Sequence, residues 1–269
     1  MLNNMEKLKI LREKTGAGIG DCQAALTEVG GDIDKAVEIL RKKGIAKAAK
    51  RSDRETREGV IKLAVSDDAK TGYIVEINAE TDFVVRSEKF QAFAAKILDL
   101  IIAKQPEDLA ELISLNFAGS TVKEDLDSLS GVIGEKLDVK RYDKLTSSGT
   151  VAVYSHSGGK IGVLAALNKE GQSDIAYDIA MQVAAANPKY IAPADVAAGE
   201  IAKEKEIYRE QLLKEGKSEN MIEKITAGKL EKFYEEVCLV KQEYIKDDKK
   251  QVEDILGGVK VEKFIRYSL

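Results

Sequence analysis

The feature that most constrains this sequence is a pattern that occurs twice. Residues 59–66 and 72–78 alternate between apolar and polar side chains around a polar turn, and residues 150–156 and 160–168 repeat the arrangement later in the chain. Alternation with a period of two places every second side chain on one face of a strand. Each pair of segments therefore predicts a β-hairpin with one face directed toward a core.

An amphipathic helix is expected after each hairpin. Apolar residues recur there at helical spacing, so they form one stripe that can cover a face of the sheet. Two hairpins with two covering helices predict tandem α+β subdomains. The stripes consist of Phe90, Phe93, Ala94, Ile97 and Ile101 in the first subdomain, and of Ile175, Ile179 and Val183 in the second.

The first fifty residues predict three short helices. Asn4 is expected to cap the first, the glycines within residues 16–20 to end it, and Asp21 to cap the second. Gly30-Gly31-Asp32 is expected to end the second helix and start the third. Because so small a bundle has a thin core, we interpret it as a recognition module. Its glycine loop with an exposed Ile19 resembles that of ubiquitin-associated domains.

A projecting helical hairpin is expected at about residues 197–244. Glu215-Gly216-Lys217 separates two charged helices, and their apolar seam is thin. Such a coiled-coil arm can form a homodimer or contact a partner. Residues 105–138 are expected to be a helical connection, with a further strand near 138–145 and a closing strand at 259–267.

Three domains follow from these patterns. Residues 1–52 form the three-helix domain and its basic linker, residues 53–138 the N-subdomain of the core, and residues 139–269 the C-subdomain with the helical hairpin. The basic stretch at 41–57 has two interpretations. It is either a solvated helical linker or a docking surface for an acidic partner or a phosphate backbone.

Composition narrows the range of functions. A formal net charge of -4 over 269 residues argues against bulk nucleic-acid binding, and the absence of Trp argues against base stacking. No apolar run approaches the ~20 residues that span a bilayer, and the N-terminus lacks a signal-peptide pattern. We therefore expect a cytoplasmic protein that binds neither nucleic acid nor membranes.

The usual catalytic groups are missing from the sequence. His156 is the single histidine, and Cys22 and Cys238 lie too far apart in sequence to indicate a common zinc site. Residues 158–162 lack the length and the hydroxyl of a phosphate-binding loop. We expect no metal, no cofactor and no active site, hence a protein-binding factor. A hydrolase with converging carboxylates is the enzyme alternative.

Motifs in the order of one known family run through nearly the whole chain. They are Leu11–Gly18, Asp21-Cys22, Ala25-Leu26, Lys43–Lys50, Val75–Val84, Gly158–Leu164, Met181–Ala185, Lys232–Leu239 and Phe264–Tyr267. Together they resemble the translation elongation factor Ts family. The family architecture, a ubiquitin-associated-like domain, a two-part α+β core and a helical hairpin, agrees with the division reached from the sequence patterns.

The resemblance implies an exchange factor that binds elongation factor Tu and promotes release of GDP, so that GTP can be taken up. In the family, the Asp and Phe of a T-D-F-V motif wedge against helices of the GTPase and disturb its magnesium and phosphate site. Here the motif is Thr81-Asp82-Phe83-Val84, called the TDFV corner below. From the residues alone, Asp82 instead reads as a helix cap and Phe83 as a core residue.

The resemblance also implies contacts outside the TDFV corner. Two methionines common in the family are replaced by Ile19-Gly20, so docking there is expected to be weaker, and an amide stands at 182 where a histidine is common. The alternative function is a binding scaffold without exchange activity that uses the N-terminal module. The implied contact residues are Arg12, Ile19, Gly20, Ile161, Gly162 and Gln182.

Overall fold

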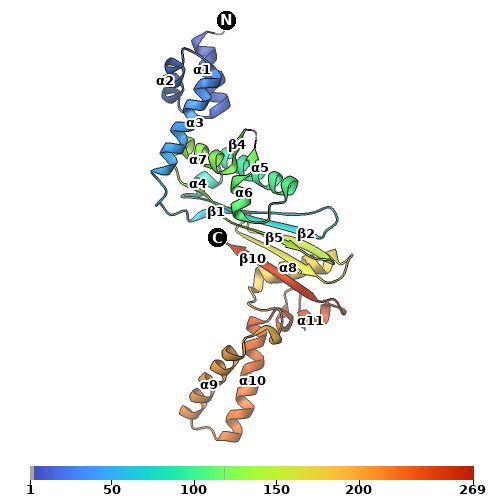
Figure 1. Cartoon of the computed structure of the whole chain (residues 1–269). Helices are drawn as coiled ribbons and strands as arrows, with labels where there is room; N and C mark the ends of the chain where they lie inside the picture. The colour runs from blue at the N-terminus through green and yellow to red at the C-terminus, as the bar shows by residue number, and fades with distance from the viewer. Residues whose placement is uncertain (1–2, 118) are drawn as a thin grey trace. The chain divides into compact units, whose positions relative to one another are not determined.

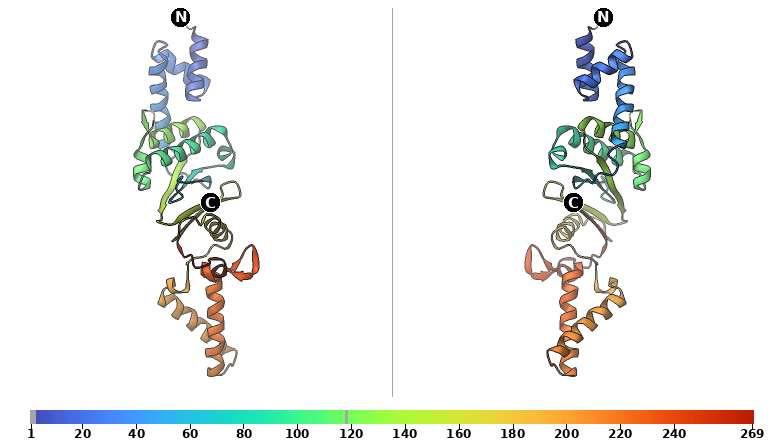
Figure 2. Two further views of the ribbon diagram at one scale, coloured as in Figure 1. Left: turned by 90° about the vertical axis from the view of Figure 1, so that its right-hand side faces the viewer. Right: turned by 90° about the vertical axis from the view of Figure 1, so that its left-hand side faces the viewer.

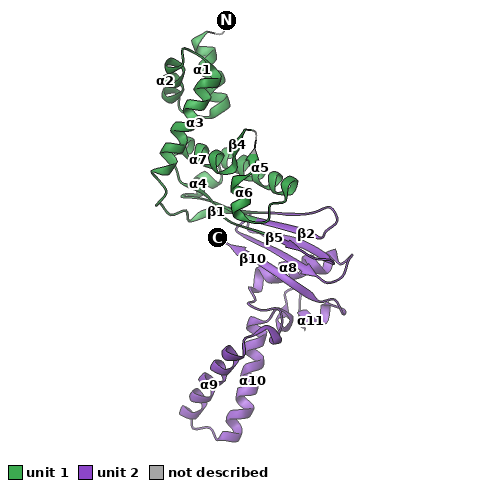
Figure 3. Ribbon diagram, in the orientation of Figure 1, with its two compact units in different colours: residues 1–62, 75–143, 269 green, residues 63–74, 144–268 purple. Residues whose placement is uncertain are grey.

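The computed structural model describes residues 3–117 and 119–269 and divides into two compact units (Figures 1 and 3). The first unit holds residues 1–62, 75–143 and 269, and the second holds 63–74 and 144–268. Helices accompany antiparallel hairpins and three-stranded sheets, so the predicted α+β class is confirmed. The domain boundaries predicted at residues 52 and 138 stay predictions.

Three N-terminal helices begin the first unit: α1 (Asn4–Thr15), α2 (Ile19–Glu28) and α3 (Ile33–Ala49). Two of the predicted caps are wrong. Asn3, not Asn4, accepts the Glu6 N–H and caps α1, and Gly18 precedes α2, which therefore begins before Asp21. The small core predicted for this bundle is present and consists of Leu11, Ala17, Cys22, Ala25, Leu26, Ala36 and Leu40.

Helix α3 extends from this bundle and packs on α7 (Val122–Ile133), as Figure 1 shows. The backbones cross closely because both helices carry glycine at the crossing. A Cβ atom at Gly131 would collide with the backbone of Gly44, and one at Gly44 would lie 3.2 Å from the Cα of Ser128. Arg41 adds an ion pair of 2.5 Å to Glu124. The N-terminal helices are thereby tied to the rest of the first unit.

The first sheet has the strand order β1 (Glu58–Val65), β2 (Thr71–Ala79) and β5 (Leu137–Thr146). Helix α5 (Glu88–Lys104) buries the predicted stripe, including Phe90 and Ile101. The remaining elements between β2 and β5 are α4 (Asp82–Val85), α6 (Leu109–Ser114), β3 (Asn116–Phe117) and β4 (Ser120–Thr121), followed by α7. The β3–β4 pair was not expected within a helical connection.

Strand β2 is buried on both faces, whereas alternation had predicted one buried face. Glu76 and Asn78, which alternate with Val75 and Ile77, are almost completely inaccessible to solvent. Glu76 is compensated by Arg141 on β5, whose Nε lies 2.6 Å from its carboxylate. A buried acidic side chain needs such a partner, because an unpaired buried charge is costly.

The second sheet repeats the topology of the first, with the order β10 (Val261–Ser268), β7 (Ile161–Leu167) and β6 (Thr150–His156). Positive φ angles at Ser157, Gly158 and Gly159 close the β6–β7 hairpin tightly, a conformation that glycine adopts at little cost. In each sheet the first two strands in sequence form a hairpin, and a strand from much later in the sequence pairs with the second hairpin strand. The predicted tandem subdomains are therefore present.

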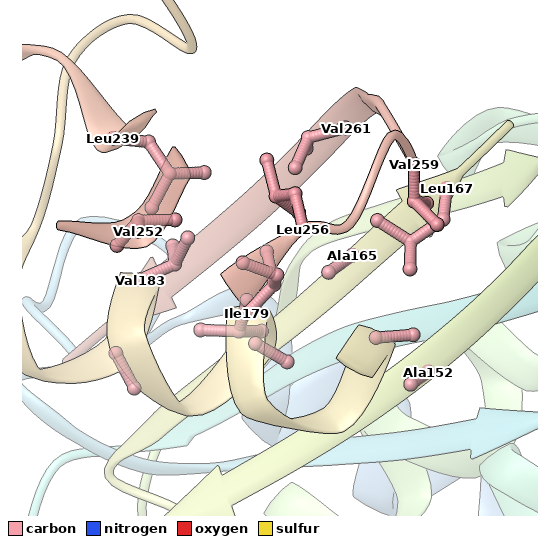
Figure 4. Close-up of a cluster of buried hydrophobic side chains, with 14 residues drawn as sticks. Ala152, Ala165, Leu167, Ile179, Val183, Leu239, Val252, Leu256, Val259 and Val261 are labelled. Atoms are coloured by element: carbon pink, nitrogen blue, oxygen red, sulfur yellow. The ribbon is translucent and has the colours of Figure 1, made fainter. Parts of the chain in front are cut away.

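Helix α8 (Ser173–Ala186) packs on β6 and β7, as predicted for the second subdomain. Its residues Ile179 and Val183 meet Leu239, Val252 and other apolar side chains from the end of the chain (Figure 4). Leu239 lies in η2 (Leu239–Lys241) and Val252 in α11 (Val252–Ile255), and the short strands β8 (Glu243–Tyr244) and β9 (Asp247–Gln251) lie between these two elements in sequence. The core of this unit thus joins segments that are distant in sequence.

The predicted helical hairpin consists of α9 (Ala198–Lys214) and α10 (Glu219–Val237), after η1 (Pro193–Asp195). The two helices lie side by side in both views of Figure 2, and they contact each other. Leu212 and Ile222 are buried near the tip, whereas Leu213 and Met221 beside them are about half exposed. Dimerisation through this arm stays a prediction.

The helix crossing predicts opposite effects for two glycine-to-alanine substitutions. Gly131→Ala places a methyl group against the Gly44 backbone, and such overpacking should lower the free energy of unfolding by about 1–3 kcal/mol. Gly228→Ala within α10 meets no atom within 4 Å and should raise it by about 0.5–1 kcal/mol through helix propensity. Denaturant unfolding followed by circular dichroism at 222 nm measures the midpoint of each variant. Equal shifts of the two midpoints would contradict the close crossing of α3 and α7.

Candidate functional site

The TDFV corner joins the end of β2 to the single-turn helix α4. Thr81 is the N-cap in extended conformation, and its hydroxyl accepts the Val84 N–H at 3.4 Å. The predicted cap, Asp82, instead lies in the first turn, where its carboxylate pairs with Arg86. A carboxylate at a helix N-terminus is electrostatically favourable, so the acid and its partner both support this short helix.

Phe83 points away from the core, with 81% of its surface exposed. The interpretation of Phe83 as a core residue is therefore wrong. Exposure of a whole aromatic side chain forgoes about 1.5–3 kcal/mol of burial free energy within the chain. That free energy remains for contact with another molecule.

Glu135, in the turn after α7, fixes the first residue of the TDFV corner. Glu135 accepts the Thr81 N–H at 3.0 Å through one oxygen and the Thr81 hydroxyl at 2.7 Å through the other. These residues lie 54 positions apart in sequence. Hydrogen bonds to an ionised acceptor are stronger than neutral ones, so the contact fixes the start of α4.

Glu80 makes the reciprocal contact with the same turn. Its carboxylate accepts the Lys136 N–H at 2.6 Å and the Arg54 guanidinium at 3.1 Å. Burial alone would raise the pKa of Glu80, but the bonds from Lys136 and Arg54 outweigh it and hold the pKa below the ordinary value of 4.5. Glu80 is therefore ionised at neutral pH and ties residue 80 to the strand that begins at 137.

The far end of α4 is fixed by the start of α5. The Ser87 hydroxyl donates to the Val84 carbonyl at 2.7 Å, and the Gln91 amide donates to the Val85 carbonyl at 2.7 Å. These side chains satisfy carbonyl groups that a one-turn helix leaves unpaired. Both ends of α4 are thus held, and the exposed Phe83 ring lies between them.

The predicted contacts of the N-terminal helices lie around the glycine loop at 16–18. Arg12 is exposed in the last turn of α1, and Ile19 and Gly20 are exposed in the first turn of α2, with Ile19 at 55%. Residues 19–20 are therefore helical, whereas they were expected in the loop. Lys89 of α5 donates to the Gly16 carbonyl at 3.1 Å and connects this loop to the helix after the TDFV corner.

The predicted contacts in the second unit are less exposed. Gly162 is buried in β7, and Ile161 packs against the core, so neither presents a whole side chain to solvent. Across the hairpin, His156 pairs in register with Ile161 and is exposed. Its Nδ1 lies 3.1 Å from the Tyr154 hydroxyl, and Tyr154 packs edge-on against the half-exposed Tyr177. The sequence analysis missed this aromatic group.

Gln182 is completely buried, so its expected direct contact with a partner does not fit its position. Its amide donates to the Glu243 carbonyl at 3.1 Å and accepts the Ile245 N–H at 2.9 Å. The side chain thereby anchors residues 243–245 to α8. Its role in this structure is internal support.

The basic stretch at 41–57 is largely neutralised within the chain. Lys43 pairs with Glu28 at 3.2 Å, Lys47 pairs with Asp21 at 3.0 Å, and Arg41 and Arg54 pair as described above. Charges that are already paired contribute less to attracting a polyanion. These pairs favour the interpretation as a helical segment of the fold over a phosphate-docking surface.

Residues 3–117 and 119–269 offer neither a metal-ligand cluster nor an activated thiol at Cys238. The described chain contains no cluster of three or more His, Cys, Asp or Glu residues that could hold a metal ion. Burial, with Asp195 and Glu200 nearby, raises the pKa of the Cys238 thiol to about 11, far from that of a reactive thiolate. In the same part of the chain, every helix is too short or too polar to cross a membrane.

Glu135 was also missed by the sequence analysis. It follows Gly134, which has a φ of 94° and ends α7, so the sequence signals a helix terminus there. Nothing in that local pattern connects Glu135 with Thr81. The contact depends on β5 pairing beside β2, which is a property of the tertiary structure.

The low pKa of Glu80 predicts a pH-dependent contribution to stability. A folded-state pKa below the unfolded value stabilises the fold above about pH 4.5, and this stabilisation is lost as the pH falls through the folded pKa. Glu80→Gln should therefore unfold at lower denaturant than the parent at pH 7, with the gap closing below pH about 4.5. A gap of constant size across this range would contradict the assignment.

Sequence comparison with known proteins shows the family of this chain. The family model described as Elongation factor TS matches residues 80–269. Elongation factor Ts of Clostridium perfringens (strain SM101 / Type A) is 43% identical over 97% of this chain and 90% of its own length. That of Prosthecochloris aestuarii is 44% identical over 97% of this chain and 96% of its own length. This chain therefore belongs to the elongation factor Ts family and has the role of a translation elongation factor.

Proposed function

We propose that this chain binds elongation factor Tu and accelerates release of its GDP, so that the GTPase can take up GTP. The observation that carries the proposal is Phe83, which is 81% exposed on a helix held at both ends. Membership of the elongation factor Ts family supports the identity of the partner. The chain acts by binding and needs no bond-forming residues of its own.

Exchange by binding follows from thermodynamic linkage. A factor that binds the nucleotide-free GTPase more tightly than the GDP-bound form weakens GDP by the same ratio, with typical coupling of about 1–3 kcal/mol. Contacts made only in the nucleotide-free form supply that difference. A protruding aromatic ring can supply such a contact. The ring binds only where the partner opens a pocket for it, and the nucleotide-free form is the one proposed to do so.

Asp82 and Phe83 together form the proposed wedge. Phe83 supplies apolar surface, and buried aromatic anchors often dominate interface energies. Asp82 places a carboxylate beside it that is 41% exposed and paired with Arg86. Near a nucleotide site, a displaced helix loses its hold on Mg²⁺ and phosphate, because the ion bridges the charged groups. Thr81 and Val84 are the residues directly before and after this pair.

Two other surfaces are proposed to hold the partner while the wedge acts. Arg12, Ile19 and Gly20 offer a mixed cationic and apolar patch on the N-terminal helices. In the second unit, Ile161-Gly162 at the start of β7 lie across the hairpin from the exposed His156 at the end of β6. Because Ile161 is partly buried, we assign the contact with elongation factor Tu to its exposed neighbour His156.

Phe83→Ala and Asp82→Ala should each slow stimulated GDP release. We expect the maximal rate with Phe83→Ala to fall by about tenfold or more, as for the loss of ~1.4 kcal/mol at a hot spot. Release of fluorescent GDP from elongation factor Tu in stopped flow measures the rate. Ile102→Ala removes another partly exposed apolar side chain, 44% exposed on α5, and serves as the matched control.

If a folded Phe83→Ala protein accelerates GDP release as much as the parent does, Phe83 does not act as a wedge. Failure of the parent protein to accelerate release at any concentration would reject exchange activity itself. The alternative of a binding scaffold that uses the N-terminal module would then be favoured.

Changes at residues 19 and 20 should alter docking without altering the maximal rate. Ile19→Ala should raise the concentration for half-maximal exchange severalfold, because it removes exposed apolar surface. Gly20→Met should lower it, since a side chain at Gly20 meets no atom within 4 Å and lies beside Ile19. Met5→Ala, at a 75% exposed position of α1, is the control. A change in the maximal rate alone would contradict a docking role.

A further inference from the structure

We propose that Glu135 is a positioning residue for exchange, which orients the Phe83 wedge by fixing the backbone of Thr81. The inference rests on the proposed function of the TDFV corner. It adds a residue that lies outside the corner and acts through it.

The carboxylate of Glu135 uses both oxygens on one residue. One accepts the Thr81 N–H at 3.0 Å, and the other accepts the Thr81 hydroxyl at 2.7 Å. The hydroxyl in turn accepts the Val84 N–H and so caps α4. A bidentate contact fixes direction as well as distance, so it sets both the backbone and the side chain from which α4 starts.

The two connected segments exchange carboxylate contacts. Glu135 accepts the N–H of Thr81, and Glu80 accepts the N–H of Lys136 at 2.6 Å. The Lys136 ammonium donates to the carbonyls of Ser52 and Arg54 at 2.7 and 2.9 Å. Residues 80–81 and 135–136 are thus joined by three hydrogen bonds to carboxylates, two accepted by Glu135 and one accepted in the opposite direction by Glu80. A shift of either segment breaks contacts on the other.

Glu135 is itself held firmly. Its carbonyl accepts the Ser130 hydroxyl at 2.6 Å, which draws the turn back onto the last residues of α7. Ser130 is buried, and its carbonyl accepts the Arg51 guanidinium at 3.3 Å from the segment after α3. The turn that supports Thr81 is therefore tied to α7, and helices hold functional groups more precisely than free loops do.

Phe83 depends on this support because it has no packing of its own. The residue is exposed, and α4 comprises only residues 82–85. The orientation of so short a helix follows from the residues that fix its two ends. Ser87 and Gln91 hold the C-terminal end, and Glu135 holds the N-terminal end through Thr81. Loss of Glu135 leaves one end free to rotate.

The test measures stopped-flow release of fluorescent GDP from elongation factor Tu across concentrations of each full-length variant. Glu135→Ala removes both acceptors, whereas Glu135→Gln keeps one oxygen. We expect the maximal rate to fall by about tenfold for Glu135→Ala, as for loss of a hydrogen bond to a charged group, and by less for Glu135→Gln. The half-maximal concentration should change by less than about threefold, because the docking surfaces are intact.

Two controls separate positioning from general destabilisation. Glu55→Gln removes a carboxylate from a 73% exposed side chain that pairs with Arg57, and it should match the parent. In the Phe83→Ala background, Glu135→Gln should cause little further loss, because residues that act through one group are not additive. Thermal unfolding of every variant shows which variants are folded. If Glu135→Ala does not fold, the test depends on Glu135→Gln.

The outcomes distinguish the two proposals. A parent protein without exchange activity, or a Phe83→Ala variant as active as the parent, rejects the proposed function. A slow Phe83→Ala variant together with folded Glu135 variants at the parental rate overturns the role of Glu135 alone. An equal fold-loss from Glu135→Gln with and without Phe83 also overturns it, because Glu135 would then act elsewhere.

Discussion

The wedge that we propose for Phe83 requires a rigid backbone beneath the ring, and two carboxylates hold that backbone in place. Glu135 holds Thr81, and Glu80 holds Lys136, so the corner and the turn after α7 are bound by reciprocal bonds. Each carboxylate satisfies a backbone N–H that would otherwise lack a partner at the end of a strand or helix. The same contacts that complete the hydrogen bonding of the fold also orient Phe83.

Helix α7 has a central part in the first unit. Its glycine crossing with α3 brings the N-terminal helices against the core, and its C-terminal turn supplies Glu135. The crossing requires residues without side chains at Gly44 and Gly131, since close backbone approach leaves no room for a Cβ atom. One helix therefore supports both the TDFV corner and the surface around Ile19 that we propose as a docking site.

The two subdomains share a topology and differ in what they insert before the last strand. In the first, the insertion contains α7 and ends in the turn that supports the corner. In the second, it contains the α9–α10 hairpin and the segment that Gln182 anchors to α8. In each subdomain, the chain leaves the sheet at the start of the insertion and returns to the same sheet with the last strand. Both ends of each insertion are therefore fixed by one sheet.

Much of this protein follows from its sequence. Alternation predicted both hairpins, helical periodicity predicted the covering stripe of α5, and Gly216 marked the turn of the helical arm, because these signals depend on neighbouring residues. The ordered family motifs singled out residues 81–84. The tertiary structure alone decided that Glu76 is buried, that Gln182 faces inward, and that Glu135 reaches Thr81. Those properties depend on which segments meet across 50 residues or more, and local patterns carry no record of that pairing.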